Sequence, residues 1–80
     1  MNTNFRIDFI TSDEFEYLAA EISFREQLLC RLYRSNTDVI KIEFMEERRI
    51  LKADIRLMFP LDGFLETVRI AREDLMALRL

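Results

Sequence analysis

The sequence predicts an α+β fold, in which an antiparallel meander sheet of four or five strands carries one C-terminal helix packed on one face. Before residue 60, apolar residues alternate with polar ones in several separate stretches, as they do in half-buried strands. From residue 61 onward they recur three or four positions apart, which is typical of an amphipathic helix. A chain of 80 residues holds one hydrophobic core, so we expect a single domain over residues 1–80.

The expected strands lie at about 4–11, 15–24, 27–34, 38–45 and 50–59. The alternation is clearest in the last of them, and β-branched and aromatic residues, which favour strands, fill the fourth. Alternate positions of a strand share one face. The residues expected to face the core are therefore Phe5, Ile7, Phe9, Leu18, Ala20, Ile22, Phe24, Leu28, Cys30, Leu32, Ile40, Ile42, Phe44, Leu51, Ala53, Ile55, Leu57 and Phe59.

Residues 12–34 allow two interpretations. As two strands joined at Arg25 and Glu26, the segment keeps most of its apolar residues on one face. The turn then lacks the Asn-Gly or Asp-Gly pair that a two-residue hairpin prefers. As an additional helix over about 13–24, capped by Ser12, the segment brings Arg25 and Glu26 onto the face that should be apolar. The hairpin accounts for more positions, and the helix remains the alternative.

The C-terminal helix is expected from about Pro60 to Ala77, because proline fits a first helical turn, where its missing N–H leaves no bond unmade. The apolar stripe of this helix comprises Leu61, Phe64, Leu65, Val68, Ala71, Leu75 and Leu78. Ile70 lies opposite Leu61 on the helical wheel. We expect it to project into solvent beside Thr67.

The runs at 21–32, 42–44 and 59–66 resemble a group of small uncharacterised bacterial proteins. Those proteins look like an antiparallel meander closed by one C-terminal helix that opens with a Pro-Leu-Asp or similar segment. The resemblance covers about residues 17–75 and implies the same fold here. It differs at Arg25 and Glu26, where a turn with glycine is expected, and it implies no activity.

Composition excludes several functions. The chain has no histidine, one cysteine and one glycine, so zinc sites, Ser-His-Asp or Cys-His catalysis, a disulfide framework and a phosphate-binding glycine loop each lack an essential part. We expect no enzyme activity, cofactor or metal. A net charge of −3 disfavours nucleic acid and anionic lipid. With no apolar run of membrane-spanning length, a cytoplasmic protein is expected, and Cys30 is expected to be a buried apolar residue.

The apolar strand faces are wider than one helix can cover. Five strands about 4.8 Å apart make a sheet roughly 20 to 24 Å wide, whereas a helix with its side chains is about 10 to 12 Å across. An uncovered apolar patch usually marks an interface. We therefore expect a non-enzymatic protein-binding domain, as a homodimer or with an obligate protein partner. A structural or regulatory homodimer of unknown role is the second hypothesis.

Two groups of residues are candidates for the interface. Tyrosine and arginine are the usual anchors of protein interfaces, which points to Arg31, Tyr33 and Arg56 on the other sheet face, with Ile70 as a weak candidate on the helix. Residues 1–26 carry a net charge of −4. Asp13, Glu14 and Glu16 in this acidic third would suit an immunity-type inhibitor that blocks the basic groove of a toxin. A third hypothesis, a small-molecule-binding module, places a pocket near Tyr17, Cys30 and Phe64.

Overall fold

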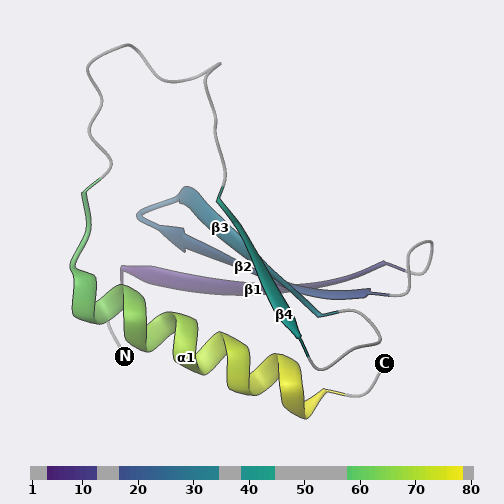
Figure 1. Ribbon diagram of the computed structural model, residues 1–80. Coiled ribbons are helices and arrows are strands. Elements are labelled where there is room, and N and C mark those ends of the chain that lie inside the picture. Colours follow the sequence, from purple (N-terminus) through teal and green to yellow (C-terminus); the bar gives the residue numbers. More distant parts are fainter. Residues whose placement is uncertain (1–3, 13–16, 35–38, 45–57, 79–80) are drawn as a thin grey trace.

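A computed structural model describes residues 4–12, 17–34, 39–44 and 58–78 of the chain. It shows one antiparallel sheet with a single helix against one face, an α+β arrangement (Figure 1). The strands follow one another in the order β1-β2-β3-β4, so the sheet is a meander. The elements are β1 (Phe5–Ser12), β2 (Tyr17–Phe24), β3 (Gln27–Arg34), β4 (Ile40–Phe44) and α1 (Leu61–Ala77).

The predicted fold class and the first four strands are confirmed. The alternative helix over 13–24 is wrong, because residues 17–24 form β2 and pair with a strand on either side. The strand predicted over 50–59 lies outside the described residues, except for positions 58 and 59, which belong to no strand. Cys30 is fully buried, as predicted, in a core formed with Ala20, Ile22 and other strand residues.

The turn between β2 and β3 is made by Arg25 and Glu26, which both have positive φ angles, of 48° and 70°. Positive φ at both central residues is what a type I′ two-residue hairpin requires, and glycine or asparagine usually supplies it. Here the backbone N–H of Arg25 donates to the carbonyl of Asn4 at 3.0 Å. The Arg25 guanidinium lies 5.2 Å from the centre of the Phe24 ring. Both contacts hold Arg25 in this unfavourable conformation.

A β-bulge in β3 changes which of two neighbouring leucines faces the core, so the prediction for these two residues is wrong. The register passes from Ile22 opposite Cys30 to Ser23 opposite Leu28, which leaves Leu29 without an opposite residue in β2. Such an extra residue shifts the alternation by one position. Leu29 is therefore buried in the core, whereas Leu28, predicted to face inward, is only half-buried.

Four phenylalanines join the start of α1 to the sheet. Phe59, just before the N-cap residue Pro60, lies with its ring 5.1 Å from that of Phe64, the fourth residue of the helix. This pair is a hydrophobic staple, which sets the angle at which the chain enters a helix. Phe5 and Phe24 extend the cluster into β1 and β2, with ring centres 4.9 Å apart and Phe24 5.9 Å from Phe59.

The buried face of α1 is rotated from the predicted stripe. Thr67, Ala71 and Leu75 are fully buried, and Leu61, Leu65 and Leu78 are exposed. The small residues at 67 and 71 let the helix backbone lie close to the sheet. The Thr67 hydroxyl needs no partner from the sheet, because it donates to the Gly63 carbonyl at 2.7 Å. The expectation that Ile70 projects into solvent beside Thr67 is wrong for the same reason: the rotation leaves Ile70 half-buried.

Arg34, at the end of β3, holds the other end of α1. Its Nη1 donates to the carbonyl oxygen of Leu75 at 2.6 Å and also to that of Leu78. The last carbonyls of a helix lack partners within the helix and carry partial negative charge, so a cation there is favourable. The last turn of α1 contains no basic residue of its own. A strand residue thus supplies the charge that the helix lacks.

Replacing Glu26 by glycine should stabilise the fold. Glycine adopts positive φ without the clash that costs other residues about 1 kcal/mol. We expect Glu26→Gly to raise the free energy of unfolding by about 1 kcal/mol, measured by urea denaturation. Gln27→Gly, one position on in β3, is the matched control and should lower it. Equal effects of the two substitutions would contradict the assigned turn.

Removing the Arg34 guanidinium should loosen the helix. Arg34→Met keeps the apolar stem but leaves the carbonyls of Leu75 and Leu78 without their donor, which should cost about 1 to 3 kcal/mol of unfolding free energy. Arg72→Met, on an exposed helix position, should change it by less than about 0.5 kcal/mol. Similar losses in both variants, by urea denaturation, would contradict the role of Arg34.

Candidate protein interface

The sheet face that points away from α1 carries a cross-strand row of charges. Glu21 on β2 lies opposite Arg31 on β3, and Arg31 lies opposite Glu43 on β4. The Nε of Arg31 donates to Glu21 Oε2 at 3.0 Å. Both side chains are largely shielded from water, at 28% and 20% exposure, which makes this pair stronger than an ordinary surface ion pair.

Tyr33 extends the row to the edge strand. Arg31 Nη1 donates to the Tyr33 hydroxyl oxygen at 2.9 Å, and that hydroxyl donates to Glu43 Oε1 at 2.9 Å. The guanidinium also lies 5.7 Å from the centre of the Tyr33 ring. The hydrogen bonds to Tyr33 and Glu21 raise the pKa of Arg31 above its ordinary value. The row is a network of polar groups that satisfy one another.

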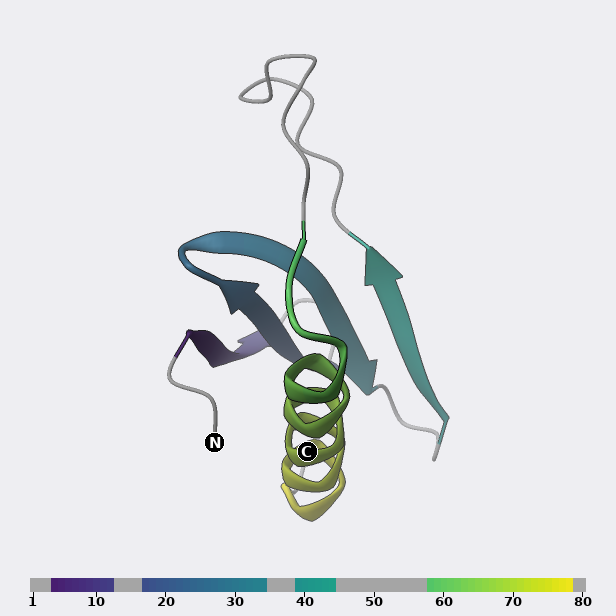
Figure 2. The ribbon, with the colours of Figure 1, turned by 90° about the vertical axis from the view of Figure 1, so that its left-hand side faces the viewer.

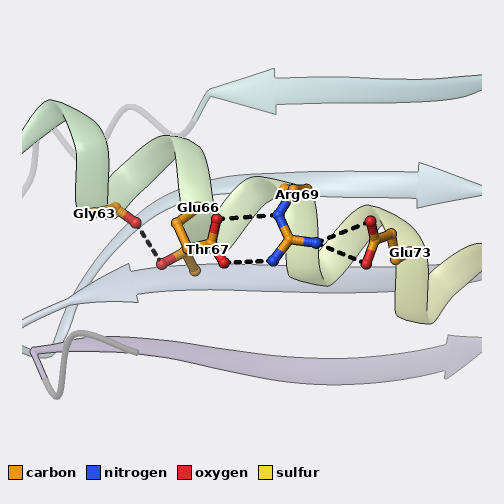
Figure 3. Close-up of polar contacts among 5 residues, drawn as sticks. All are labelled: Gly63, Glu66, Thr67, Arg69 and Glu73. Atoms are coloured by element: carbon orange, nitrogen blue, oxygen red, sulfur yellow. Dashed lines mark hydrogen bonds and ion pairs between the residues drawn. The ribbon is translucent and has the colours of Figure 1, made fainter.

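The solvent side of α1 is satisfied in the same way (Figure 3). Arg69 donates from Nε to Glu66 Oε2 at 3.0 Å and from Nη1 to Glu73 at 2.9 Å. The hydrogen bond from Arg69 lowers the pKa of Glu66. The pKa of Arg69 is raised by both carboxylates, and the effect of Glu66 is the larger. Spacings of three and four residues bring such side chains together on a helix. All three are well exposed, so the cluster contributes little to stability.

The structure brings together only two of the predicted interface residues. Arg31 and Tyr33 adjoin on the outer sheet face. Ile70 belongs to α1, on the other side of the sheet, so it cannot share a surface with them. Asp13, Glu14, Glu16 and Arg56 lie outside the described residues. Of the residues near which a small-molecule pocket is predicted, Cys30 is buried in the core and the half-buried Phe64 packs against it.

The helix-bearing side of the sheet is incompletely covered. α1 packs mainly on β1, β2 and β3, and a view along the helix shows β4 lying to one side of it (Figure 2). Ile42 and Phe44 lie opposite the core residues Leu32 and Cys30, so they share the core face. Their exposed fractions are nonetheless 47% and 66%. Both apolar side chains are therefore exposed to solvent at the edge of the core.

Two further exposed apolar side chains, Leu61 and Leu65, belong to α1. Figure 3 shows Gly63 and Thr67 on the side of the helix toward β1 and β2. At 100° per residue, Leu61 and Leu65 lie on the opposite flank, which faces β4. They are 67% and 54% exposed. We call Ile42, Phe44, Leu61 and Leu65 together the β4–α1 strip.

The sequence predicts that an apolar surface stays uncovered, but it does not predict where in the fold that surface lies. The mismatch in width between sheet and helix predicts that some core-face residues stay uncovered. It does not say which strand the helix leaves aside. That depends on the rotation and position of α1, which Thr67, Ala71 and Arg34 fix through contacts distant in sequence. Tyrosine and arginine content instead directed the prediction to the outer face.

Two observations on the described residues concern metal binding and thiol chemistry. Within them, no three His, Cys, Asp or Glu side chains gather as metal ligands would. Burial raises the pKa of the Cys30 thiol to about 11, which suppresses the thiolate that a nucleophile requires. In the part of the chain that the structure describes, no helix has the length and apolar character needed to cross a bilayer.

The buried thiol should make stability fall at high pH. An unfolded Cys30 releases its proton near pH 9, whereas the folded one holds it to about pH 11. Folding then favours the protonated thiol, so its contribution is complete below pH 9 and is lost as pH rises to 11. The stability difference between wild type and Cys30→Ala should therefore shrink by on the order of 2 kcal/mol between pH 8 and 11. Parallel pH profiles in urea denaturation would contradict this.

Comparison with known proteins adds no relative. No protein-family model, no curated protein and no solved structure matches this chain. The resemblance to a group of small bacterial proteins therefore stays a prediction.

Proposed function

We propose that the chain is a non-enzymatic protein-binding domain whose contact surface is the β4–α1 strip. The observation that carries this proposal is the exposure of four large apolar side chains, two on β4 and two on α1. Clusters of this kind on a small protein usually mark a binding site. The two halves come from elements that are fixed to the same core, so the surface exists before a partner arrives.

The outer sheet face is the weaker candidate. Arg31 and Tyr33 are anchor types, but their polar atoms already bond to Glu21 and Glu43. A partner would have to break these bonds or leave them as they are, and neither adds much affinity. On the β4–α1 strip, by contrast, binding removes apolar surface from water, which is favourable in itself.

A protein partner also agrees with the rest of the chain. The described residues hold neither a metal cluster nor a reactive thiol, and the net charge of −3 does not suit a polyanion. We propose an oligomeric, cytoplasmic protein, since the one cysteine is a free thiol of the kind that a reducing compartment maintains. Inhibition of a basic toxin would be one use of such a domain.

Site-specific crosslinking in the native cell tests the proposed surface. A photocrosslinking phenylalanine analogue at position 65 should give one discrete protein adduct, identified by mass spectrometry. The matched control is the same analogue at Phe9, which is 46% exposed but lies on β1, at the opposite edge of the sheet. An adduct from position 9 alone, or none from position 65, would contradict the proposal.

A further inference from the structure

We propose that two copies of the chain associate by antiparallel pairing of their β4 strands, with Ile42 on the twofold axis. This inference rests on the proposed function, because it names the partner of the β4–α1 strip as a second copy of the chain. It follows from three features: the edge position of β4, the order of its charges and the uncovered apolar residues beside it.

β4 is an edge strand among the described residues. It pairs with β3 on one side, and no described strand lies on the other. An edge strand presents unpaired N–H and C=O groups that can bond to another strand. β1, at the opposite edge, is less suited, because α1 packs on it and Phe5 is buried.

The side chains of β4 are complementary to those of a second, antiparallel β4. With Ile42 opposite the partner's Ile42, Lys41 faces the partner's Glu43 on the outer side of the joined sheet. The same contact repeats across the twofold axis, so each dimer gains two pairs of opposite charge in directly facing positions. Glu43 is already oriented for this contact by the hydroxyl of Tyr33 at 2.9 Å.

Other registers lose one of these advantages. Centring the pairing on Lys41 places two lysines face to face, and centring it on Glu43 does the same with two glutamates, both of which are unfavourable. A shift by one residue in the pairing turns the second copy over. Its β4–α1 strip would then lie on the opposite face of the joined sheet.

In the Ile42-centred register the two strips meet. Both helices lie on the same side of the joined sheet, because facing residues of antiparallel strands point to the same side. Ile42 packs beside the partner's Ile42, and Phe44 beside the partner's Ile40, so the apolar side chains of the two β4 strands shield one another across the axis. Leu61 and Leu65 of each copy flank this row. The contact uses the same surface on both copies, so it closes at a dimer instead of growing into a filament.

β1 has a similar order of charges and therefore supplies the control. Arg6 and Asp8 flank Ile7 as Lys41 and Glu43 flank Ile42. Arg6 and Asp8, however, already form an ion pair within β1 at 3.0 Å. Reversing a charge on β1 should leave association unchanged, while reversing one on β4 should not.

Sedimentation of the full chain over micromolar to submillimolar concentrations tests the register. We expect a dimer, with a dissociation constant about tenfold higher for Lys41→Glu and for Glu43→Lys, because each places two like-charged pairs across the axis. The doubly exchanged variant should regain the wild-type constant. That recovery cannot come from the bond between Tyr33 and Glu43, which the exchange does not restore. An equimolar mixture of the two single variants should form a mixed dimer.

Three outcomes would overturn the pairing. One is a monomer at every concentration, which includes the case in which the strand predicted over 50–59 pairs with β4 of its own chain. Another is a dimer whose dissociation constant is unchanged in both single variants, and the third is a dimer weakened by Asp8→Lys.

If the chain is a monomer and position 65 crosslinks to a different protein, self-pairing fails and the proposed function stands. If no adduct forms, both fail.

Discussion

The attachment of α1 at both of its ends determines the rest of the molecule. Phe59 and Phe64 hold its start against β1 and β2, and Arg34 holds its last carbonyls from the end of β3. Between these points, small buried residues bring the helix backbone close to the sheet. A helix fixed in this way cannot move sideways to cover β4. The exposed apolar residues of β4 are therefore a consequence of how the core is tied together.

The two faces of the sheet differ in how their side chains interact with water. On the outer side, arginine, tyrosine and glutamate neutralise one another across three strands, and the face is stable in water without a partner. On the helix-bearing side, the apolar side chains of Ile42 and Phe44 on β4 remain exposed. Polar groups can satisfy each other in place, whereas apolar groups are satisfied only by being covered.

The spacing of apolar residues predicted the strands and the helix. The features that it did not predict depend on contacts between residues distant in sequence. The alternation of residues such as Phe5 and Ile7 and the spacing of Phe64, Val68 and Ala71 predicted strands and helix, because both depend on neighbours in the chain. The bulge at Leu29, the rotation of the helix toward Thr67 and the bond from Arg34 to Leu75 depend on residues far apart in sequence. The β4–α1 strip depends on those same contacts, which residue types alone do not reveal, so tyrosine and arginine pointed to the outer face instead.

The tight turn at Arg25 and Glu26 has a consequence for the order of folding. Its two residues resist the backbone angles that they adopt, so the loop does not by itself bring β2 and β3 together. The strands must be aligned by burial of Ala20, Ile22 and Cys30, with the tip closing afterward. Substitutions at the tip should then alter the unfolding rate more than the folding rate, and the reverse would show that the loop leads.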